Sequence, residues 1–392
     1  MDWSIYSWMW TLGGAMAITL ILGGLLIYPA LVLRRYVRIM INILDDVAPT
    51  PENGGNDSQR WNGEEVSFRA VDGHRLEGTI LAHRDADSLP LGMVVFAHEF
   101  GTDRACCLRY CRPLLDAGYD VFSFDFRGHG ASAPEEGYRP RQWPSDRERD
   151  DMLGAIAFIS SYLEQQDRPC DIGVFGISRG GGAAILAAAA VDNVRAVVTD
   201  GAFSSDTTLE YLMRRFATIF ARIRVVAENH PPVFWRFLRW LLFRECARRF
   251  NCRFPSVRKA VVRMGPKPIL LIHGEKDSYI PIAQSQALYR LAAGPKSLWI
   301  VAGAGHNKSV LVAPKVYADR VLRFFDEHLA VPRRSPRPIP VRPSRREELL
   351  AVARMQPFRA PAPPPVRKRR DGGLERRRGW GVVRAKPRHV VV

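Results

Sequence analysis

The sequence G-I-S-R-G at residues 176–180 has the spacing of a turn that carries a nucleophile. It follows an apolar run and opens a stretch of glycine and alanine, so the serine stands between a predicted strand and a predicted helix. A serine on such a sharp turn needs glycine two residues to either side, because glycine lets the neighbouring backbone come close. The pattern predicts Ser178 as a nucleophile, with Gly176 and Gly180 making room for it. A chance glycine-rich turn is the alternative.

A serine hydroxyl becomes nucleophilic beside a base, and the base needs a third group that orients it. Two loops downstream supply these groups: Asp277 follows the apolar run I-L-L-I-H-G, and His306 follows S-L-W-I-V. Open α/β sheets place their sites at the carboxyl ends of strands, where both loops are expected. We therefore predict a catalytic triad of Ser178, His306 and Asp277. Asp200 also ends a predicted strand and is the competing acid.

Acyl transfer through a serine also needs donors for the oxyanion that develops on the substrate carbonyl. The residue after the nucleophile supplies one backbone amide, which here is that of Arg179. The loop after the predicted strand at 93–97 supplies the second. In its sequence H-E-F-G, the candidate is the amide of Phe100.

The elements that must position these residues are strands and helices in alternation. Residues 65–81 contain two alternating runs around Asp72-Gly73, which predicts a hairpin. Six apolar runs of the doubly covered kind follow, at 93–97, 120–125, 171–176, 196–200, 269–274 and 297–301. Helical stretches separate them. The sequence predicts one α/β domain over residues 64–331, with a mainly parallel sheet flanked by helices.

The alternation breaks at about residues 204–264, where helical stretches mix large apolar residues with arginine. We predict a helical lid inserted into the domain. Its apolar residues either pack on the main domain or else line an acyl pocket or touch a bilayer. The residues concerned are Phe234, Trp235, Phe237, Leu238, Trp240 and Leu241.

An uncharged stretch at about residues 10–33 is long enough to cross a bilayer, and aromatic residues flank it on both sides. A cleaved signal peptide is the alternative, but no Lys or Arg precedes the stretch and no small-x-small site follows closely. We predict a single-pass transmembrane anchor and juxtamembrane segment over residues 1–44. Arginines follow the span, so the positive-inside rule places the catalytic domain in the cytoplasm. Residues 45–63, rich in Pro, Gly, Asn and Asp, are predicted to be a linker.

The formal net charge of +17 is concentrated at the C-terminus. From Arg333 to Val392 there are 18 Lys and Arg against four Asp and Glu, which leaves a net of +3 for the rest of the chain. Residues 332–392 are rich in Pro and Arg and are predicted to be a disordered tail. Such a tail either contacts anionic lipid, binds nucleic acid or has no dedicated partner; nucleic acid is the least favoured, because the folded part lacks the charge. The six cysteines form no CxxC pair, which argues against a zinc site.

Taken together, the segments HEFG, DFRGHGAS, GISRGG, HGEKD and GAGH resemble the α/β-hydrolase superfamily, near its acylglycerol-lipase and serine-aminopeptidase-like branch. The resemblance covers residues 64–330, and the Ser, Asp, His order along the chain is the order of that superfamily. Glu99 departs from the family pattern, which usually has glycine there, and places a carboxylate in the oxyanion loop. The resemblance implies that His129 is structural.

These observations predict a serine hydrolase that cleaves carboxylic esters through an acyl-enzyme, with lipid-like acyl esters or thioesters as candidate substrates. No metal or organic cofactor is implied. Two alternatives remain: an aminopeptidase or amidase on the same fold, and a non-catalytic hydrolase-like scaffold at the membrane. Glu99 favours the scaffold, whereas the presence of Ser, Asp and His at three matching positions favours catalysis.

Overall fold

The computed structural model describes most of the predicted hydrolase domain and part of the N-terminal segment. The described residues are 12–18, 23–24, 27, 30–31, 33–35, 37–42, 63–85, 88–220 and 231–330. Nearly all of the predicted linker and all of the predicted basic tail lie outside them.

The predicted transmembrane span at 10–33 falls only partly on described residues. Within those residues, no helix combines the length and the apolar character needed to cross a membrane. The described residues of this segment that lie between 12 and 42 are helical.

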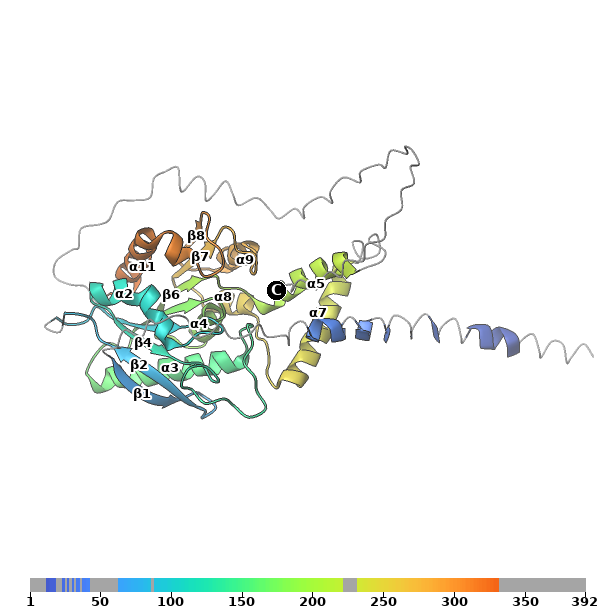
Figure 1. Cartoon of the computed structure of the whole chain (residues 1–392), viewed down its shortest axis with the longest axis horizontal. Helices are drawn as coiled ribbons and strands as arrows, with labels where there is room; N and C mark the ends of the chain where they lie inside the picture. The colour runs from blue at the N-terminus through green and yellow to red at the C-terminus, as the bar shows by residue number, and fades with distance from the viewer. Residues whose placement is uncertain are drawn as a thin grey trace, which may run out of the picture. The chain divides into compact units, whose positions relative to one another are not determined.

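Eight strands form one sheet in the order β1-β2-β4-β3-β5-β6-β7-β8 (Figure 1). Pairing is antiparallel between β1 and β2 and between β2 and β4, and parallel everywhere else. The mainly parallel sheet, the hairpin and the six apolar strands predicted from the sequence are confirmed. The bounds are β1 Glu64–Arg69, β2 Arg75–Leu81, β3 Met93–Ala97, β4 Asp120–Phe124, β5 Ile172–Ile177, β6 Val194–Asp200, β7 Ile269–Gly274 and β8 Lys296–Val301.

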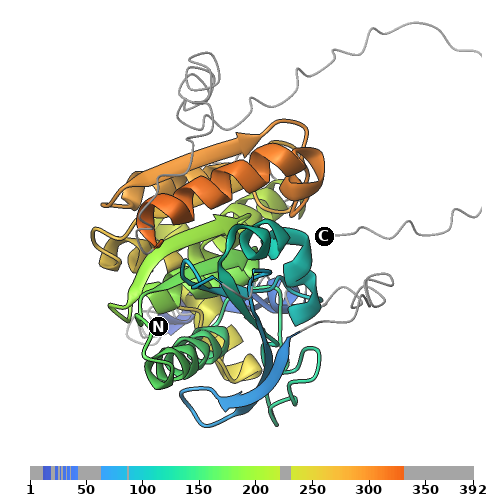
Figure 2. The ribbon, with the colours of Figure 1, turned by 90° about the vertical axis from the view of Figure 1, so that its left-hand side faces the viewer.

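Helices cover both faces of the sheet, which is why the central strands are continuously apolar. One face packs against α3, α4, α8 and α9, and the other packs against α2 and α11, with α10 alongside (Figure 2). The bounds are α2 Cys107–Ala117, α3 Asp146–Gln165, α4 Arg179–Ala188, α8 Val257–Arg263, α9 Ala283–Leu291, α10 Ser309–Val312 and α11 Pro314–His328, with a 3₁₀ turn η1 at Arg104–Cys106. Every residue of β3, β4, β5 and β7 is buried.

The region that breaks the strand–helix alternation contains α5 Ser205–Phe220 and α7 Pro232–Phe250, followed by α8, and stands between β6 and β7. Helices α5 and α7 contact each other beyond the end of the sheet (Figure 1). Six apolar residues were predicted either to pack on the main domain or else to line an acyl pocket or touch a bilayer, and they differ in burial. Trp235 and Leu238 are buried, Phe234 and Leu241 are half-buried, and Phe237 and Trp240 are exposed.

Candidate active site

Ser178 stands on the turn between β5 and α4 in a backbone conformation that side chains rarely adopt, with φ 51° and ψ −115°. Its amide donates to the carbonyl oxygen of Asp200 at the end of the neighbouring strand, at 2.7 Å. A Cβ on Gly176 would lie 2.5 Å from the carbonyl oxygen of Gly180, and one on Gly180 would lie 2.3 Å from that of Ala97. The two glycines therefore let β5, α4 and β3 approach closely around the serine.

The structure brings the three predicted side chains into one hydrogen-bonded chain. Ser178 Oγ lies 2.9 Å from His306 Nε2, and His306 Nδ1 lies 2.6 Å from Asp277 Oδ2. The side chain of Asp277 is 1% exposed and that of His306 is 19% exposed. The loops after β5, β7 and β8 supply one residue each, because the carboxyl ends of parallel strands meet at one edge of the sheet.

Asp277 is held as an oriented carboxylate. Its second oxygen accepts hydrogen bonds from the amides of Tyr279 and Ile280, at 2.9 and 2.8 Å. Burial raises its pKa, but the hydrogen bond and charge of His306 and the amide of Ile280 outweigh burial and leave the pKa below its usual value. An ionised Asp277 accepts from His306, so the proton of the imidazole sits on Nδ1 and the lone pair of Nε2 faces Ser178.

Asp200, the competing acid, makes no hydrogen bond to the imidazole, whose two nitrogens lie against Ser178 and Asp277. It is fully buried, and its Oδ1 accepts from the hydroxyl of Ser309 at 3.1 Å. Burial raises the pKa of Asp200 to about 7, opposed by that hydrogen bond and by the positive potential of His306. The structure thus places Asp277, and not Asp200, against His306.

A second buried histidine, not identified from the sequence, braces the Asp277 loop. His273 at the end of β7 donates from Nε2 to the carbonyl oxygen of Ile280 at 2.9 Å, and its Nδ1 lies 2.7 Å from Ser285 Oγ. Burial lowers its pKa, which keeps the ring neutral. Ile280 is thus held through both its amide, which donates to Asp277, and its carbonyl. The sequence does not predict this role, because a single histidine inside an apolar run does not indicate which backbone groups it will bind.

The predicted second oxyanion donor belongs to a peptide unit that two side chains hold in place. His98 Nδ1 and Thr102 Oγ1 both donate to the carbonyl oxygen of Glu99, at 2.7 and 3.1 Å. His98 Nε2 accepts from the amide of Phe126 at 3.1 Å, so Nδ1 carries the proton. In a trans peptide the carbonyl of Glu99 and the N–H of Phe100 point in opposite directions. Fixing the carbonyl therefore fixes the direction of the Phe100 N–H.

The side chain of Glu99, which departs from the family pattern, is turned into the protein and is only 8% exposed. Its Oε2 accepts from Cys106 Sγ at 3.7 Å. Burial raises its pKa, and its own amide, Arg109, Cys106 and His306 oppose that rise. His306 is therefore close enough to influence the pKa of Glu99, although Ser178 and Asp277 are the groups that hydrogen-bond to the imidazole.

His129 and the side chain of Arg179 form a buried support behind the nucleophile. Arg179 Nη2 donates to His129 Nε2 at 3.2 Å, and burial together with the Arg179 charge lowers the pKa of His129 to about 3. The guanidinium also lies over the rings of Phe100 and Phe126, at 5.1 and 5.2 Å from their centroids. The neutral His129 is placed as a structural residue, and Arg179 links the nucleophile turn to the oxyanion loop. The buried arginine carried no such signal in the sequence.

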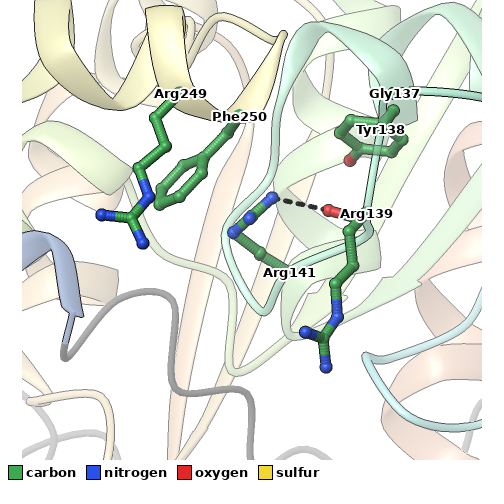
Figure 3. Close-up of a pocket in the computed structure, with 6 residues that line it drawn as sticks. All are labelled: Gly137, Tyr138, Arg139, Arg141, Arg249 and Phe250. Atoms are coloured by element: carbon green, nitrogen blue, oxygen red, sulfur yellow. Dashed lines mark hydrogen bonds between the residues drawn. The ribbon is translucent and has the colours of Figure 1, made fainter.

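A cavity of about 350 Å³ lies near the C-terminal end of α7, away from the triad residues. Arg141 stacks on Phe250, with its guanidinium carbon 3.4 Å from the ring centroid, and donates to the carbonyl oxygen of Arg139 at 2.7 Å (Figure 3). The lining residues are Gly137, Tyr138, Arg139, Arg141, Arg249 and Phe250. None of the triad residues lines this cavity, and neither does any other serine, cysteine or histidine.

For metals, the part of the chain that the structure describes contains no group of three or more His, Cys, Asp or Glu side chains arranged to hold an ion. All six cysteines are free thiols, and burial raises the pKa of Cys107 to about 12. Ser178, His306 and Asp277 are the described side chains that the structure arranges as a nucleophile, a base and an acid.

The strand order, the turn after β5 and the arrangement of serine, histidine and aspartate define an α/β-hydrolase fold. Residues 94–320 match the model of the alpha/beta hydrolase family. The chain therefore belongs to the alpha/beta hydrolase family.

Relatives and solved structures agree with this assignment. The uncharacterized protein YqkD of Bacillus subtilis is 26% identical over 258 residues, which cover 65% of this chain and 76% of YqkD. The lysophosphatidylserine lipase ABHD12 of Danio rerio is 30% identical over 191 residues, covering 48% of this chain and 43% of ABHD12. The Pyrococcus furiosus esterase Pf2001 superposes with a TM-score of 0.52 at 22% identity, over 72% of this chain and 98% of the esterase. At this identity the likeness to the esterase concerns the fold alone.

Proposed function

We propose that this protein is a serine esterase that cleaves carboxylic esters through Ser178, His306 and Asp277. The observation that carries the proposal is the continuous chain from Ser178 Oγ through both imidazole nitrogens to a buried carboxylate. A structural serine would have no need of a strained turn that aims its hydroxyl at a histidine held in one tautomer.

The geometry supports the following sequence of steps. His306 Nε2 takes the proton of Ser178 as its Oγ attacks the ester carbonyl, and Asp277 stabilises the imidazolium that forms. The imidazolium then gives its proton to the leaving alcohol, and an acyl-enzyme remains on Ser178. Water deprotonated by the same imidazole attacks the acyl group, and the acid leaves as Ser178 regains its proton.

The oxyanion of each tetrahedral intermediate is bound by the amides of Phe100 and Arg179. Arg179 begins α4, so its amide lies at the positive end of a helix. The peptide unit before Phe100 is held by His98 and Thr102, so this donor does not have to reorient during the reaction.

We propose lipid-like acyl esters as the substrate class, with thioesters accepted by the same chemistry. Two observations support this: the aromatic residues of α7, which we assign to a lid, and the likeness to a relative named as a lysophosphatidylserine lipase. Fold alone does not set substrate, so chain-length dependence is the measurement that defines the pocket.

We further propose that residues 10–33 anchor the protein in a membrane, with the hydrolase domain on the cytoplasmic side. The uncharged stretch, its aromatic flanks and the arginines that follow it support this assignment. The basic residues after Arg333 are proposed to contact anionic headgroups, since each lysine or arginine near such a surface contributes roughly 1 kcal/mol.

The test is labelling of the detergent-solubilised full chain with a fluorophosphonate probe, alongside turnover of p-nitrophenyl esters of graded chain length. We expect wild-type protein to label and to turn over ester, and we expect both signals to vanish in Ser178→Ala and His306→Ala. Ser309→Ala, which alters a buried serine beside Asp200, is the matched control and keeps both signals. Folded wild-type protein that neither labels nor cleaves any ester would establish the scaffold alternative instead.

A further inference from the structure

Helix α7 has large apolar side chains on both faces, and the domain covers only one of them. The inner face is buried at helical spacing and consists of Trp235, Leu238, Leu242, Cys246 and Phe250. On the opposite side, Val233, Phe237 and Trp240 are 61%, 49% and 53% exposed. Positions 233, 237, 240 and 244 share one side of a helix, so these three residues form one stripe. Exposed apolar residues gathered in this way mark a contact surface.

Arginines accompany the apolar stripe. Arg236, Arg244 and Arg248 are exposed on the same side, and α7 as a whole has five arginines against one glutamate. Arg244 lies over the ring of Trp240, 5.5 Å from its centroid, and Phe237 stacks on Trp240 at 5.9 Å. Tryptophan and phenylalanine among arginines is the composition of helices that lie at the boundary between lipid headgroups and acyl chains.

The N-terminal segment packs against the inner side of the same helix. Val37, Met40 and Ile41 are buried in one cluster with Trp235 and Leu242. Leu33 is half-buried against the same cluster, whereas Leu12, Met16, Ile18, Ile27 and Leu31 are exposed. The segment that we propose as the membrane anchor thus leads directly to α7.

We propose that the outer face of α7, defined by Val233, Arg236, Phe237, Trp240 and Arg244, is a docking surface for an anionic phospholipid bilayer. This inference rests on the proposed membrane location, and it assigns to α7 a contact separate from the chemistry of Ser178. Phe237 and Trp240 enter the acyl boundary while the arginines remain at the phosphates. A second copy of the chain fits this face less well, because a two-fold contact would set arginines against arginines.

The first experiment measures where Trp240 lies. The full chain is reconstituted into vesicles of phosphatidylcholine and phosphatidylglycerol with or without brominated acyl chains. Subtracting the emission of Trp240→Phe from that of the wild type isolates the signal of Trp240. We expect this signal to be quenched by the brominated lipid, and less so in Arg236→Glu/Arg244→Glu or without phosphatidylglycerol. A Trp240 signal that bromine leaves unchanged overturns the proposal.

The second experiment separates docking from catalysis. In Phe237→Ser/Trp240→Ser we expect KM for an ester embedded in the vesicles to rise about tenfold, because losing aromatic area from lipid costs on the order of 1.4 kcal/mol. Turnover of water-soluble p-nitrophenyl butyrate stays unchanged. Val71→Ser/Leu89→Ser removes two exposed apolar side chains outside α7 and changes neither reaction.

Two other outcomes count against the docking surface. An equal effect of the α7 variant on both esters overturns it, because the substitutions would then act on the site or on folding. A lipid-independent dimer that Trp240→Ser dissociates also overturns it, because a second copy would cover the face. If the wild type cleaves neither ester, the proposed esterase function fails, and quenching of Trp240 still decides whether α7 docks.

Discussion

In the loop after β3, two side chains fix the orientation of the peptide unit between Glu99 and Phe100. His98 directly follows β3, and Thr102 lies four residues further along the same loop; both donate to the Glu99 carbonyl oxygen. We propose that both act as positioning residues, through the direction that they impose on the Phe100 amide.

Replacing Thr102 tests this role. In Thr102→Val the hydroxyl is lost at nearly constant shape, and we expect kcat to fall about tenfold with KM unchanged. The loss is smaller than the roughly 10²-fold cost of deleting a donor outright, because His98 still holds the carbonyl. Steady-state kinetics with a soluble ester measure it, and Thr102→Ser serves as the rescuing variant. A rise in KM at constant kcat would assign Thr102 to substrate binding.

Replacing each of the two buried aspartates near His306 by asparagine is expected to change kcat by very different factors. Asp277→Asn removes the acceptor of the Nδ1 proton and favours the tautomer that donates toward Ser178, so kcat falls by roughly 10³- to 10⁴-fold. Asp200→Asn leaves the partner of the imidazole in place and changes kcat by less than about tenfold. The rate of fluorophosphonate labelling ranks the two variants, and a reversed ranking would make Asp200 the acid of the triad.

At the scale of elements, the sequence predicts strands better than it predicts the contacts between loops. Mostly apolar runs identify β3 to β8, because helices on both faces of a sheet favour apolar side chains at nearly every position of such strands. The hydrogen-bond partners of His98 and Arg179 were not predictable from the sequence. His98 accepts from the Phe126 amide and Arg179 donates to His129, and these groups are neighbours only because β3, β4 and β5 pair side by side. Likewise, which face of α7 is buried depends on the N-terminal segment and on α5, which helical periodicity alone does not reveal.

The junction of β5, α4 and β3 depends on Gly180. A Cβ there would lie 2.3 Å from the Ala97 carbonyl oxygen and 2.5 Å from that of His98, and both are backbone atoms that cannot rotate away. We expect Gly180→Ala to lower the free energy of unfolding by about 1–3 kcal/mol or more and to displace the oxyanion loop. Urea denaturation of the full chain in detergent measures the first effect and kcat the second. An unchanged midpoint would mean that β3 and α4 can move apart at little cost in the free energy of unfolding.

For the whole molecule, burial of ionisable groups links stability to pH. Asp200 is protonated in the folded state up to about pH 7, whereas its ordinary pKa is 3.8. The folded state therefore binds one more proton than the unfolded state between these values, and the contribution of this group is lost as pH rises through the folded pKa.

Asp200→Asn removes that dependence while keeping the shape of the side chain. Relative to the wild type, we expect the variant to gain stability as pH rises from 4 to 8, by up to about 4 kcal/mol for a shift of roughly 3 pKa units. Urea midpoints of both proteins at pH 4 and pH 8 give the difference, in which all other titrating groups cancel. A difference that is constant between the two pH values would show that Asp200 is ionised when folded.

The positive φ of Ser178 also limits how the chemistry of this scaffold can change over evolutionary time. A β-branched side chain is strongly disfavoured in that region of φ and ψ, whereas an unbranched one is tolerated at a cost. Cysteine has the shape of serine and threonine does not. Descendants of this protein can therefore exchange their oxygen nucleophile for sulfur by a single substitution, while a threonine nucleophile would first require a different turn.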